Sequence, residues 1–256
     1  MIRTLSIVIL LLTSLSGFGQ QSSVSIFAHN DYEKPTPLLV AYNAQAGFIE
    51  ADILLYGYDL LVAHEIKEIQ KDKTLDALYL APLDRLIKKN GGSAYADKEK
   101  SLTLMIDLKT ESFATLNALV AKLKKYPDLI GCRTLIITVS GNIPIPAVWK
   151  KFPDFIHFDG QPGIAYTTDQ QKRIRLVSAS FLSYSKWNGK DELRKSELEK
   201  IITVIEAAHA INKPFRFWAI PDFPESWTKL MELGVDVINT DDVVGLATFL
   251  KESKLK

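Results

Sequence analysis

Two pairs of polar side chains interrupt apolar stretches that have the pattern of buried strands. Glu50 and Asp52 are separated by one residue, and so are Asp107 and Lys109. Because side chains alternate between the two faces of a strand, each pair points to one side. Burying a bare carboxylate costs on the order of several kcal/mol unless a counter-charge compensates it. We therefore expect Glu50, Asp52 and Asp107 to hold one divalent cation, and their all-oxygen ligands favour Mg²⁺ or Ca²⁺ over zinc.

Each pair also has a simpler explanation. The strand that carries Glu50 and Asp52 could be amphipathic, with both acids in water, although this is less natural for a parallel barrel strand. Asp107 and Lys109 could form only a local ion pair, which is common and weak at protein surfaces. We favour the metal site, and we expect Lys109 to bind a phosphate oxygen beside the ion.

Two of the four histidines follow short apolar runs, His29 after residues 25–28 and His64 after residues 60–63. The active sites of α/β barrels lie at the carboxyl ends of the strands. Two imidazoles beside a metal-bound phosphodiester would form an acid–base pair, in which one accepts a proton from the nucleophile and the other donates one to the leaving group. His209 is expected to be an ordinary structural histidine.

Three further residues are expected to line the site. His157 and Asp159 share one face of a strand, and we expect them to line the site as secondary residues. Trp218 is expected to form a wall of the site, and its alternative role is ordinary packing inside the barrel.

Strand-like and helix-like segments alternate along the chain, which implies a parallel sheet. About eight apolar runs look buried, and a length of 256 residues matches the roughly 250 residues of a TIM (β/α)₈ barrel. Prolines between residues 140 and 175 leave room there for only a short helix or a loop. The expected strands are 25–28, 48–55, 60–63, 102–108, 134–139, 155–158, 176–182, 215–220 and 235–239, and the expected helices are 36–46, 74–89, 113–125, 195–211, 226–233 and 243–251.

The N-terminus has the pattern of a secretory signal. Arg3 is followed by an apolar run from Leu5 to Leu15, and small residues precede a cleavage point after Gly19. The run is short for a bilayer span, so we expect residues 1–19 to be a cleaved signal peptide, with an uncleaved anchor as the alternative. Residues 20–256 would then form a single exported domain, periplasmic or secreted, without a stable membrane anchor.

The composition of the chain excludes some classes of binding partner. The net charge is +1, with 31 basic and 30 acidic residues, so a nucleic-acid-binding surface is not expected. Cys132 is the one cysteine, which excludes an intramolecular disulfide and indicates an isolated buried thiol. The sequence leaves the oligomeric state open.

The order His29, Glu50-x-Asp52, His64 resembles the glycerophosphodiester phosphodiesterase and PI-PLC-like superfamily. The endings Trp-Ala-Ile-Pro-Asp at 218–222 and Leu-Gly-Val-Asp-Val-Ile-Asn-Thr-Asp at 233–241 share this resemblance, which extends from about residue 26 to residue 250. It implies a TIM barrel, a metal bound by Glu50, Asp52 and a third acid, acid–base roles for the two histidines, and a small phosphodiester or phospholipid-derived substrate.

Two departures from the superfamily pattern bear on specificity. The usual Arg-Gly after the first histidine is Asn30-Asp31 here, so Asn30 is expected to replace the arginine as a contact to phosphate or to the metal site. The usual Glu-x-Lys is Asp107-x-Lys109, which resembles the Asp-Leu-Lys-Thr stretch of sphingomyelinase-D-like phospholipases. The His-Asn-Asp-Tyr opening with Glu-Ala-Asp is similar to an uncharacterised branch typified by fungal altered-inheritance-of-mitochondria proteins.

The sequence thus predicts a metal-dependent phosphoric diester hydrolase, with a cyclic phosphate as the intermediate that the resemblance implies. Two other functions stay open: a sugar-directed metal hydrolase or isomerase on the same barrel, and a secreted metal- and ligand-binding barrel without turnover. Lys109 beside the acids favours a phosphate ligand over a sugar.

Overall fold

The computed structural model describes residues 24–253. The expected signal peptide, residues 1–19, lies outside the described residues. Within residues 24–253, no helix combines the length and the apolarity that crossing a membrane requires.

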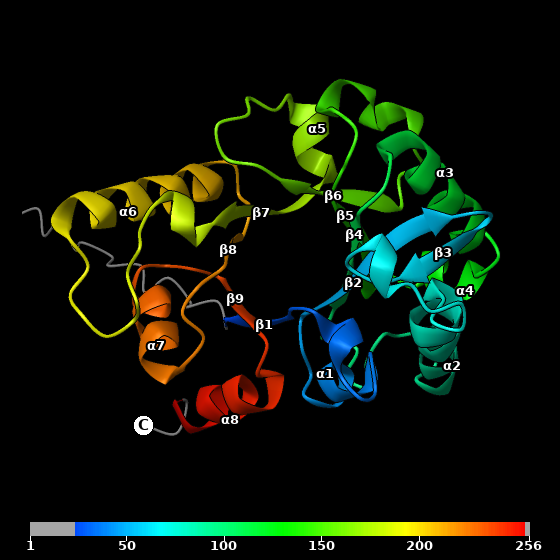
Figure 1. Cartoon of the computed structure of the whole chain (residues 1–256), viewed down its shortest axis with the longest axis horizontal. Coiled ribbons are helices and arrows are strands. Elements are labelled where there is room, and N and C mark those ends of the chain that lie inside the picture. Colours follow the sequence, from blue (N-terminus) through cyan, green and yellow to red (C-terminus); the bar gives the residue numbers. More distant parts are fainter. Residues whose placement is uncertain (1–23, 254–256) are drawn as a thin grey trace, which may run out of the picture.

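Eight parallel strands close into a barrel (Figure 1), which confirms the predicted fold. The ring runs β1-β2-β4-β5-β6-β7-β8-β9 and closes where β9 pairs with β1. Its strands are β1 (Ser25–Ala28), β2 (Phe48–Tyr56), β4 (Leu102–Leu108), β5 (Leu135–Gly141), β6 (Ile156–Gly160), β7 (Ile174–Ser180), β8 (Phe215–Trp218) and β9 (Val237–Thr240).

A further strand, β3 (Asp59–Val62), lies outside the ring. It pairs antiparallel with β2 through a hairpin, with Ile53 opposite Val62 and Tyr56 opposite Asp59. Gly57 in the turn has φ = 61°, a left-handed conformation that glycine adopts without steric cost. The expected short strand at residues 60–63 is therefore one arm of a hairpin rather than a stave of the barrel.

Helices surround the ring. They are α1 (Leu39–Asn43), α2 (Ala81–Lys89), α3 (Ser112–Leu123), α4 (Pro127–Gly131), α5 (Thr168–Arg173), α6 (Lys195–Ala210), α7 (Pro224–Glu232) and α8 (Val243–Ser253). Short 3₁₀ turns cover Asp31–Glu33, Ile66–Glu68, Pro146–Lys151 and Phe181–Ser183, and a π turn at Asp76–Leu80 precedes α2. The region from 140 to 175 contains only the turn at Pro146–Lys151 and the six-residue α5 between its strands, as predicted.

The predicted helix at residues 36–46 is wrong in its length, because only Leu39–Asn43 is helical. Leu38 has φ = 67°, so the helix cannot extend backwards through it. The buried side chain of Asp31 accepts a hydrogen bond from the Leu38 amide at 2.6 Å, and this contact holds the non-helical start in place.

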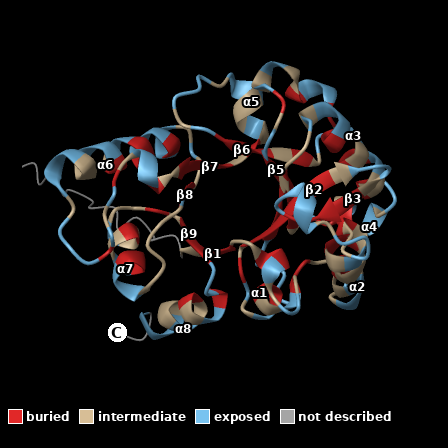
Figure 2. Cartoon of the chain, in the orientation of Figure 1, coloured by how far each residue is buried: buried red, intermediate tan, exposed pale blue. Residues whose placement is uncertain are grey.

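The barrel interior changes character along its axis. Buried residues follow the ring of strands (Figure 2). At the amino end of the strands the interior is apolar and contains Phe27, Phe48, Met105, Leu176 and Val237. Toward the carboxyl end the inward-facing positions become polar, because the alternation that points Phe48 inward also points Glu50 and Asp52 inward.

Candidate active site

A pocket of about 400 Å³ opens at the carboxyl ends of the barrel strands. Its lining includes eight of the residues that the sequence proposed for the site: His29, Asn30, Glu50, Asp52, His64, Asp107, Lys109 and Trp218. The other lining residues are Ser140, Gly141, Ile143, Asp159, Gln161, Ser178 and Arg216.

The three acidic side chains converge. Asp52 and Asp107 face each other across the β2–β4 pair, and one oxygen of each, together with one of Glu50, lies within 4.8 Å of the others. Glu50 and Asp52 are buried, with 6% and 2% of their surface exposed. Burial raises the pKa of Glu50, although Arg216 and His29 oppose this effect. A buried cluster of oxygen donors that repel one another fits a hard divalent cation.

Lys109 provides the positive charge nearest to two of these acids. Its Nζ lies 2.9 Å from Asp52 Oδ2 and 3.0 Å from Asp107 Oδ1. Burial works to lower the pKa of Lys109, but Asp107 and Asp52 outweigh it and raise the pKa overall. Lys109 therefore stays an ammonium ion at neutral pH, beside the carboxylates.

Two residues of β5 position Asp107. Ser140 Oγ donates a hydrogen bond of 2.9 Å to Asp107 Oδ2. Gly141 has φ = 71°, and a Cβ atom built on it would meet the Asp107 carboxylate and lie 2.8 Å from the carbonyl oxygen of Leu108. Only glycine therefore leaves space for the Asp107 side chain to turn toward the pocket.

Each histidine in the pocket is bound to a carboxylate through Nδ1. His29 Nδ1 lies 2.9 Å from Asp241 Oδ1, and His64 Nδ1 lies 2.8 Å from Asp52 Oδ2. His29 Nε2 lies 3.8 Å from Glu50 Oε2. A carboxylate at Nδ1 fixes the ring orientation and leaves Nε2 as the nitrogen that can exchange a proton with a substrate.

Asp241, which the sequence did not single out for this role, is itself held by Asp222. The Asp222 carboxylate accepts hydrogen bonds from the Asp241 amide at 2.7 Å and from the Thr240 hydroxyl at 3.0 Å. Trp227 Nε1 donates to its other oxygen at 2.8 Å. Asp222 thus holds the Thr240-Asp241 segment in place, and Asp241 in turn binds the His29 ring.

Asn30 contacts the site through its backbone. Its φ of 49° is left-handed, a conformation that asparagine tolerates better than most residues, and its amide donates a hydrogen bond of 3.1 Å to Glu50 Oε2. The Asn30 side-chain oxygen accepts a hydrogen bond of 3.2 Å from the Tyr32 hydroxyl. The same hydroxyl lies within 3.0 Å of Asp52 Oδ2, so Tyr32 also belongs to the carboxylate cluster.

Sequence reasoning missed Arg216, which lies in the pocket with 4% of its surface exposed. Its guanidinium stacks 3.7 Å from the centre of the Phe27 ring and donates hydrogen bonds to Ser178 Oγ at 3.1 Å and to Asn239 Oδ1 at 3.4 Å. The signal was present in the sequence: Phe-Arg-Phe-Trp at 215–218 places a charge inside an apolar strand, as Glu50 does.

Asp159 faces Arg216 but does not reach it with a hydrogen bond. Its Oδ2 lies 3.9 Å from Arg216 Nη2, and its buried Oδ1 has no hydrogen-bond partner among residues 24–253. Burial raises the pKa of Asp159 to about 7, against the opposing effect of Arg216. The pKa of this carboxyl is therefore near neutrality.

Of the other sequence candidates, one lines the pocket and the rest lie outside its lining. Trp218 lines the pocket and is 44% exposed, which fits a wall rather than core packing. His157, expected beside Asp159, is absent from the pocket lining. His209 Nε2 lies 2.7 Å from Asp236 Oδ2, remote from this pocket, as expected of a structural histidine. Cys132 is buried and unpaired, as predicted.

Comparisons with known proteins place the chain among phosphodiesterase-like sequences. A family model described as an AIM6-like phosphodiesterase domain matches residues 18–129, and the glycerophosphoryl diester phosphodiesterase family matches residues 214–243. The altered inheritance of mitochondria protein 6 homolog of Arthroderma benhamiae is 26% identical over 86% of this chain and 82% of its own length. Its counterpart in Kluyveromyces lactis is 27% identical over 88% of this chain and 72% of its own length.

Solved structures share the fold. A glycerophosphodiester phosphodiesterase from Parabacteroides distasonis superposes with a TM-score of 0.58 at 14% identity, covering 92% of this chain and 99% of the other. An Oleispira antarctica phosphodiesterase in complex with the product sn-glycerol-3-phosphate gives a TM-score of 0.51 at 12% identity, covering 89% and 96%.

Proposed function

As a member of the glycerophosphodiester phosphodiesterase and PI-PLC-like superfamily that is similar to altered inheritance of mitochondria protein 6, this chain is, we propose, a metal-dependent phosphoric diester hydrolase. One observation carries the proposal. The carboxylates of Glu50, Asp52 and Asp107 meet in the pocket that His29 and His64 also line.

Glu50, Asp52 and Asp107 would hold one Mg²⁺ or Ca²⁺ ion. When bound, such an ion neutralises charge on the non-bridging oxygens of a phosphodiester. The buried, mutually repelling donors support this assignment, because without a counter-charge their burial is costly.

His29 and His64 would move the protons. One Nε2 accepts a proton from the attacking hydroxyl, and the other donates a proton to the leaving oxygen. The superfamily resemblance favours a neighbouring hydroxyl of the substrate as the nucleophile, which would form a cyclic phosphate and release an alcohol. The two imidazoles differ in the carboxylate that binds Nδ1. His29 is bound by Asp241, which is not one of the three proposed metal ligands, whereas His64 is bound by Asp52, which is one of them.

Lys109 and Arg216 would bind the phosphate from opposite sides. In the ring of eight strands, β4 and β8 lie across from each other, so Lys109 after β4 and Arg216 on β8 face one another over the pocket. Arg216 would supply the guanidinium that the superfamily pattern places directly after the first histidine, where this chain has Asn30. A planar guanidinium can donate two parallel hydrogen bonds to phosphate oxygens.

Phosphorus NMR of the purified chain with mixed phosphodiesters, with and without a chelator, tests the proposal. We expect turnover that stops when the chelator is added and returns with Mg²⁺ or Ca²⁺, and the spectra report any cyclic phosphate directly. Full turnover in chelator would contradict the metal assignment. Binding of diesters without turnover would indicate a ligand-binding barrel instead.

We also propose that the chain is exported, on the pattern of residues 1–19. Sequencing the N-terminus of the protein recovered from its native cells checks this. A mature chain that begins near residue 20 is expected, and an intact N-terminus with retention inside the cell would contradict it.

A further inference from the structure

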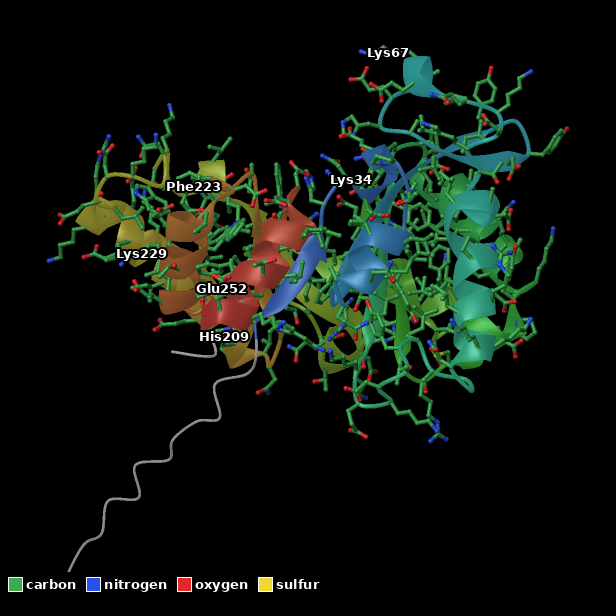
Figure 3. The ribbon with its side chains drawn as sticks, turned by 90° about the horizontal axis from the view of Figure 1, so that it is seen from below. Lys34, Lys67, His209, Phe223, Lys229 and Glu252 are labelled. Atoms are coloured by element: carbon green, nitrogen blue, oxygen red, sulfur yellow. The ribbon has the colours of Figure 1, made fainter. Side chains whose placement is uncertain are left out.

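A second cavity, of about 420 Å³, lies at the other end of the barrel, where the strands begin. Its lining comes from the first residues of strands and from the segments that lead into them, and it includes Phe48, Arg175, His209, Lys213 and Asp236. Figure 3 shows the separation from the side: His209 lies toward the lower end, and Lys67, three residues after His64, lies near the upper end. The cavity is therefore distinct from the candidate active site.

Arg175, the second residue of β7, brings to this cavity a guanidinium that no acid neutralises. Its Nε donates a hydrogen bond of 3.0 Å to Thr103 Oγ1, and its Cζ stacks 5.1 Å from the centre of the Phe48 ring. Within residues 24–253, its two terminal nitrogens have no hydrogen-bond partner, and no carboxylate lies at ion-pair distance. Burial lowers the pKa of this guanidinium, so its surroundings disfavour the charge that it carries.

Lys213 supplies a second cation to the same cavity. It stands directly before Pro214, is partly buried, and forms no ion pair with any acid of residues 24–253. Burial lowers the pKa of its ammonium group, and the charge of Arg175 lowers it further. The two cations therefore repel each other at this end of the barrel, and a bound anion would relieve both effects.

No acidic side chain of the chain itself supplies the missing charge. Residues 1–23 and 254–256 contain neither aspartate nor glutamate. Asp236 lines the cavity, but its Oδ2 accepts hydrogen bonds from His209 Nε2 at 2.7 Å and from the Phe215 amide at 2.8 Å, and it reaches neither cation at ion-pair distance. The counter-charge for the two cations must therefore come from outside the side chains of the protein.

We propose that this cavity binds the phosphate group of a small ligand, either free phosphate or the end of a phosphorylated molecule. Two positive side chains match the charge of roughly −1.5 to −2 that a phosphate monoester carries near pH 7. A guanidinium donates paired hydrogen bonds to phosphate oxygens, and a lysine adds a compact charge beside them. A carboxylate, with a single charge, would leave one cation without compensation. The site is additional to the candidate active site and does not depend on the proposed hydrolase.

Calorimetric titration of the full chain with inorganic phosphate, in chelator and at low ionic strength, tests the site. Arg175→Gln/Lys213→Gln should weaken binding about tenfold or more, because both counter-charges of the anion are lost. The matched control, Lys186→Gln/Lys190→Gln, changes the net charge equally by removing two exposed lysines that do not line the cavity. It should bind phosphate like the original chain.

A third variant, Lys109→Gln, locates the bound anion, because phosphate would also suit the candidate active site. It should keep the affinity of the original chain. Loss of binding in Lys109→Gln would overturn the inference, and so would unchanged binding in Arg175→Gln/Lys213→Gln or a Kd of the original chain above about 10 mM.

If Arg175→Gln/Lys213→Gln does not fold, Lys213→Gln alone replaces it. The Lys213 side chain forms no hydrogen bond or ion pair within residues 24–253, so its loss should leave the fold intact and still weaken phosphate binding measurably. Unchanged binding in this single variant would overturn the inference as well.

Two further titrants identify the ligand more closely. Tighter binding of sn-glycerol 3-phosphate than of inorganic phosphate would identify a phosphorylated molecule, and the reverse order would identify free phosphate. Acetate should bind at least about tenfold more weakly than either. Acetate that binds equally well would overturn the assignment to phosphate. None of these measurements requires turnover of a diester, so a failure of this site and a failure of the proposed hydrolase are observed separately.

Discussion

The two sides of the barrel mouth contrast in charge. On the side of β2 and β4, three carboxylates crowd together, and Lys109 lies between two of them. On the side of β6 and β8, Arg216 has hydroxyl and amide partners at hydrogen-bonding distance, but its nearest carboxylate, Asp159, is 3.9 Å away. The β2–β4 side therefore carries more negative than positive groups, and the β6–β8 side carries a guanidinium that no carboxylate reaches with a hydrogen bond. A cation on the first side and a phosphate between the two sides would complement these charges.

Substitutions on the acidic side, at β2 and β4, should reduce activity more than substitutions on the other side. If the proposed function holds, Glu50→Gln and Asp107→Asn should each lower diesterase activity by about 10³-fold or more, because each would remove a ligand of the charge-neutralising ion. A second readout is thermal melting: Mg²⁺ or Ca²⁺ should raise the melting temperature of the original chain but not of these variants.

Asp159→Asn is the matched control for these two changes, since it removes a buried carboxylate from the opposite side. It should keep the rise in melting temperature with metal. If it abolished that rise while Glu50→Gln kept it, the ion would belong to the other side of the mouth.

Removal of either imidazole should have the next largest effect on activity. His29→Ala and His64→Ala should each lower kcat by about 10²-fold, because each removes a proton donor or acceptor. His209→Ala, a change of the same kind outside the pocket, should leave kcat unaltered. Wild-type rates in either pocket variant would exclude that histidine from the chemistry.

Arg216→Lys should have a smaller effect, about tenfold in kcat/KM, because the charge remains while the paired donors of the guanidinium are lost. Arg175 offers a close control, since it also stacks over a phenylalanine, Phe48, at 5.1 Å, but binds Thr103 at the opposite end of the barrel interior. An equal loss in Arg175→Lys would indicate that Arg216 acts on barrel stability rather than on the phosphate.

The last effect concerns stability rather than activity. The pKa of Asp159 is raised to about 7 by burial, so the folded state binds a proton there that the unfolded state has already released. Its contribution to the free energy of unfolding is therefore present at low pH and declines as pH rises from about 4 to 7, by up to about 1.4 kcal/mol per pH unit.

Urea unfolding of the original chain and of Asp159→Asn across this range measures the difference. The free energy of unfolding of the original chain should fall relative to that of the variant as pH rises. Parallel pH profiles would show that the pKa of Asp159 is the same in the folded and the unfolded chain.

The residues on the β2–β4 side of the pocket could be predicted from the sequence more easily than those on the β6–β8 side. Glu50 and Asp52 share a strand, and Asp107 with Lys109 repeats their spacing, so strand periodicity alone brings these residues to one face. The rule that strand ends carry the site places His29, which follows the ring strand β1, whereas His64 reaches the pocket because the antiparallel β2–β3 hairpin returns the chain to it. The closed barrel followed from the alternation of strands and helices.

The sequence places a charge inside the apolar strand at Arg216, but the partners that this residue and His29 gain across the barrel could not be found in this way. Arg216 gains its role from Ser178 on the neighbouring strand β7, 38 positions earlier, and from a ring that sets β8 opposite β4. The bond between His29 and Asp241 joins residues 212 positions apart. No local pattern encodes a contact that exists only after the ring has closed. The length of α1 escaped for a different reason, since a short-range hydrogen bond from the Leu38 amide to the Asp31 side chain decides it.

The position of β3 has a consequence for how such a protein can diversify. The ring is complete without this strand, because β2 already pairs with β1 and β4, so the hairpin arm that leads to His64 can lengthen, shorten or tilt while the ring keeps its hydrogen bonds. His29, by contrast, follows β1 directly and is fixed to the frame. One imidazole thus follows the frame of the barrel directly, and the other lies on a hairpin whose length can change while the ring stays intact, provided that the bond of His64 to Asp52 is kept.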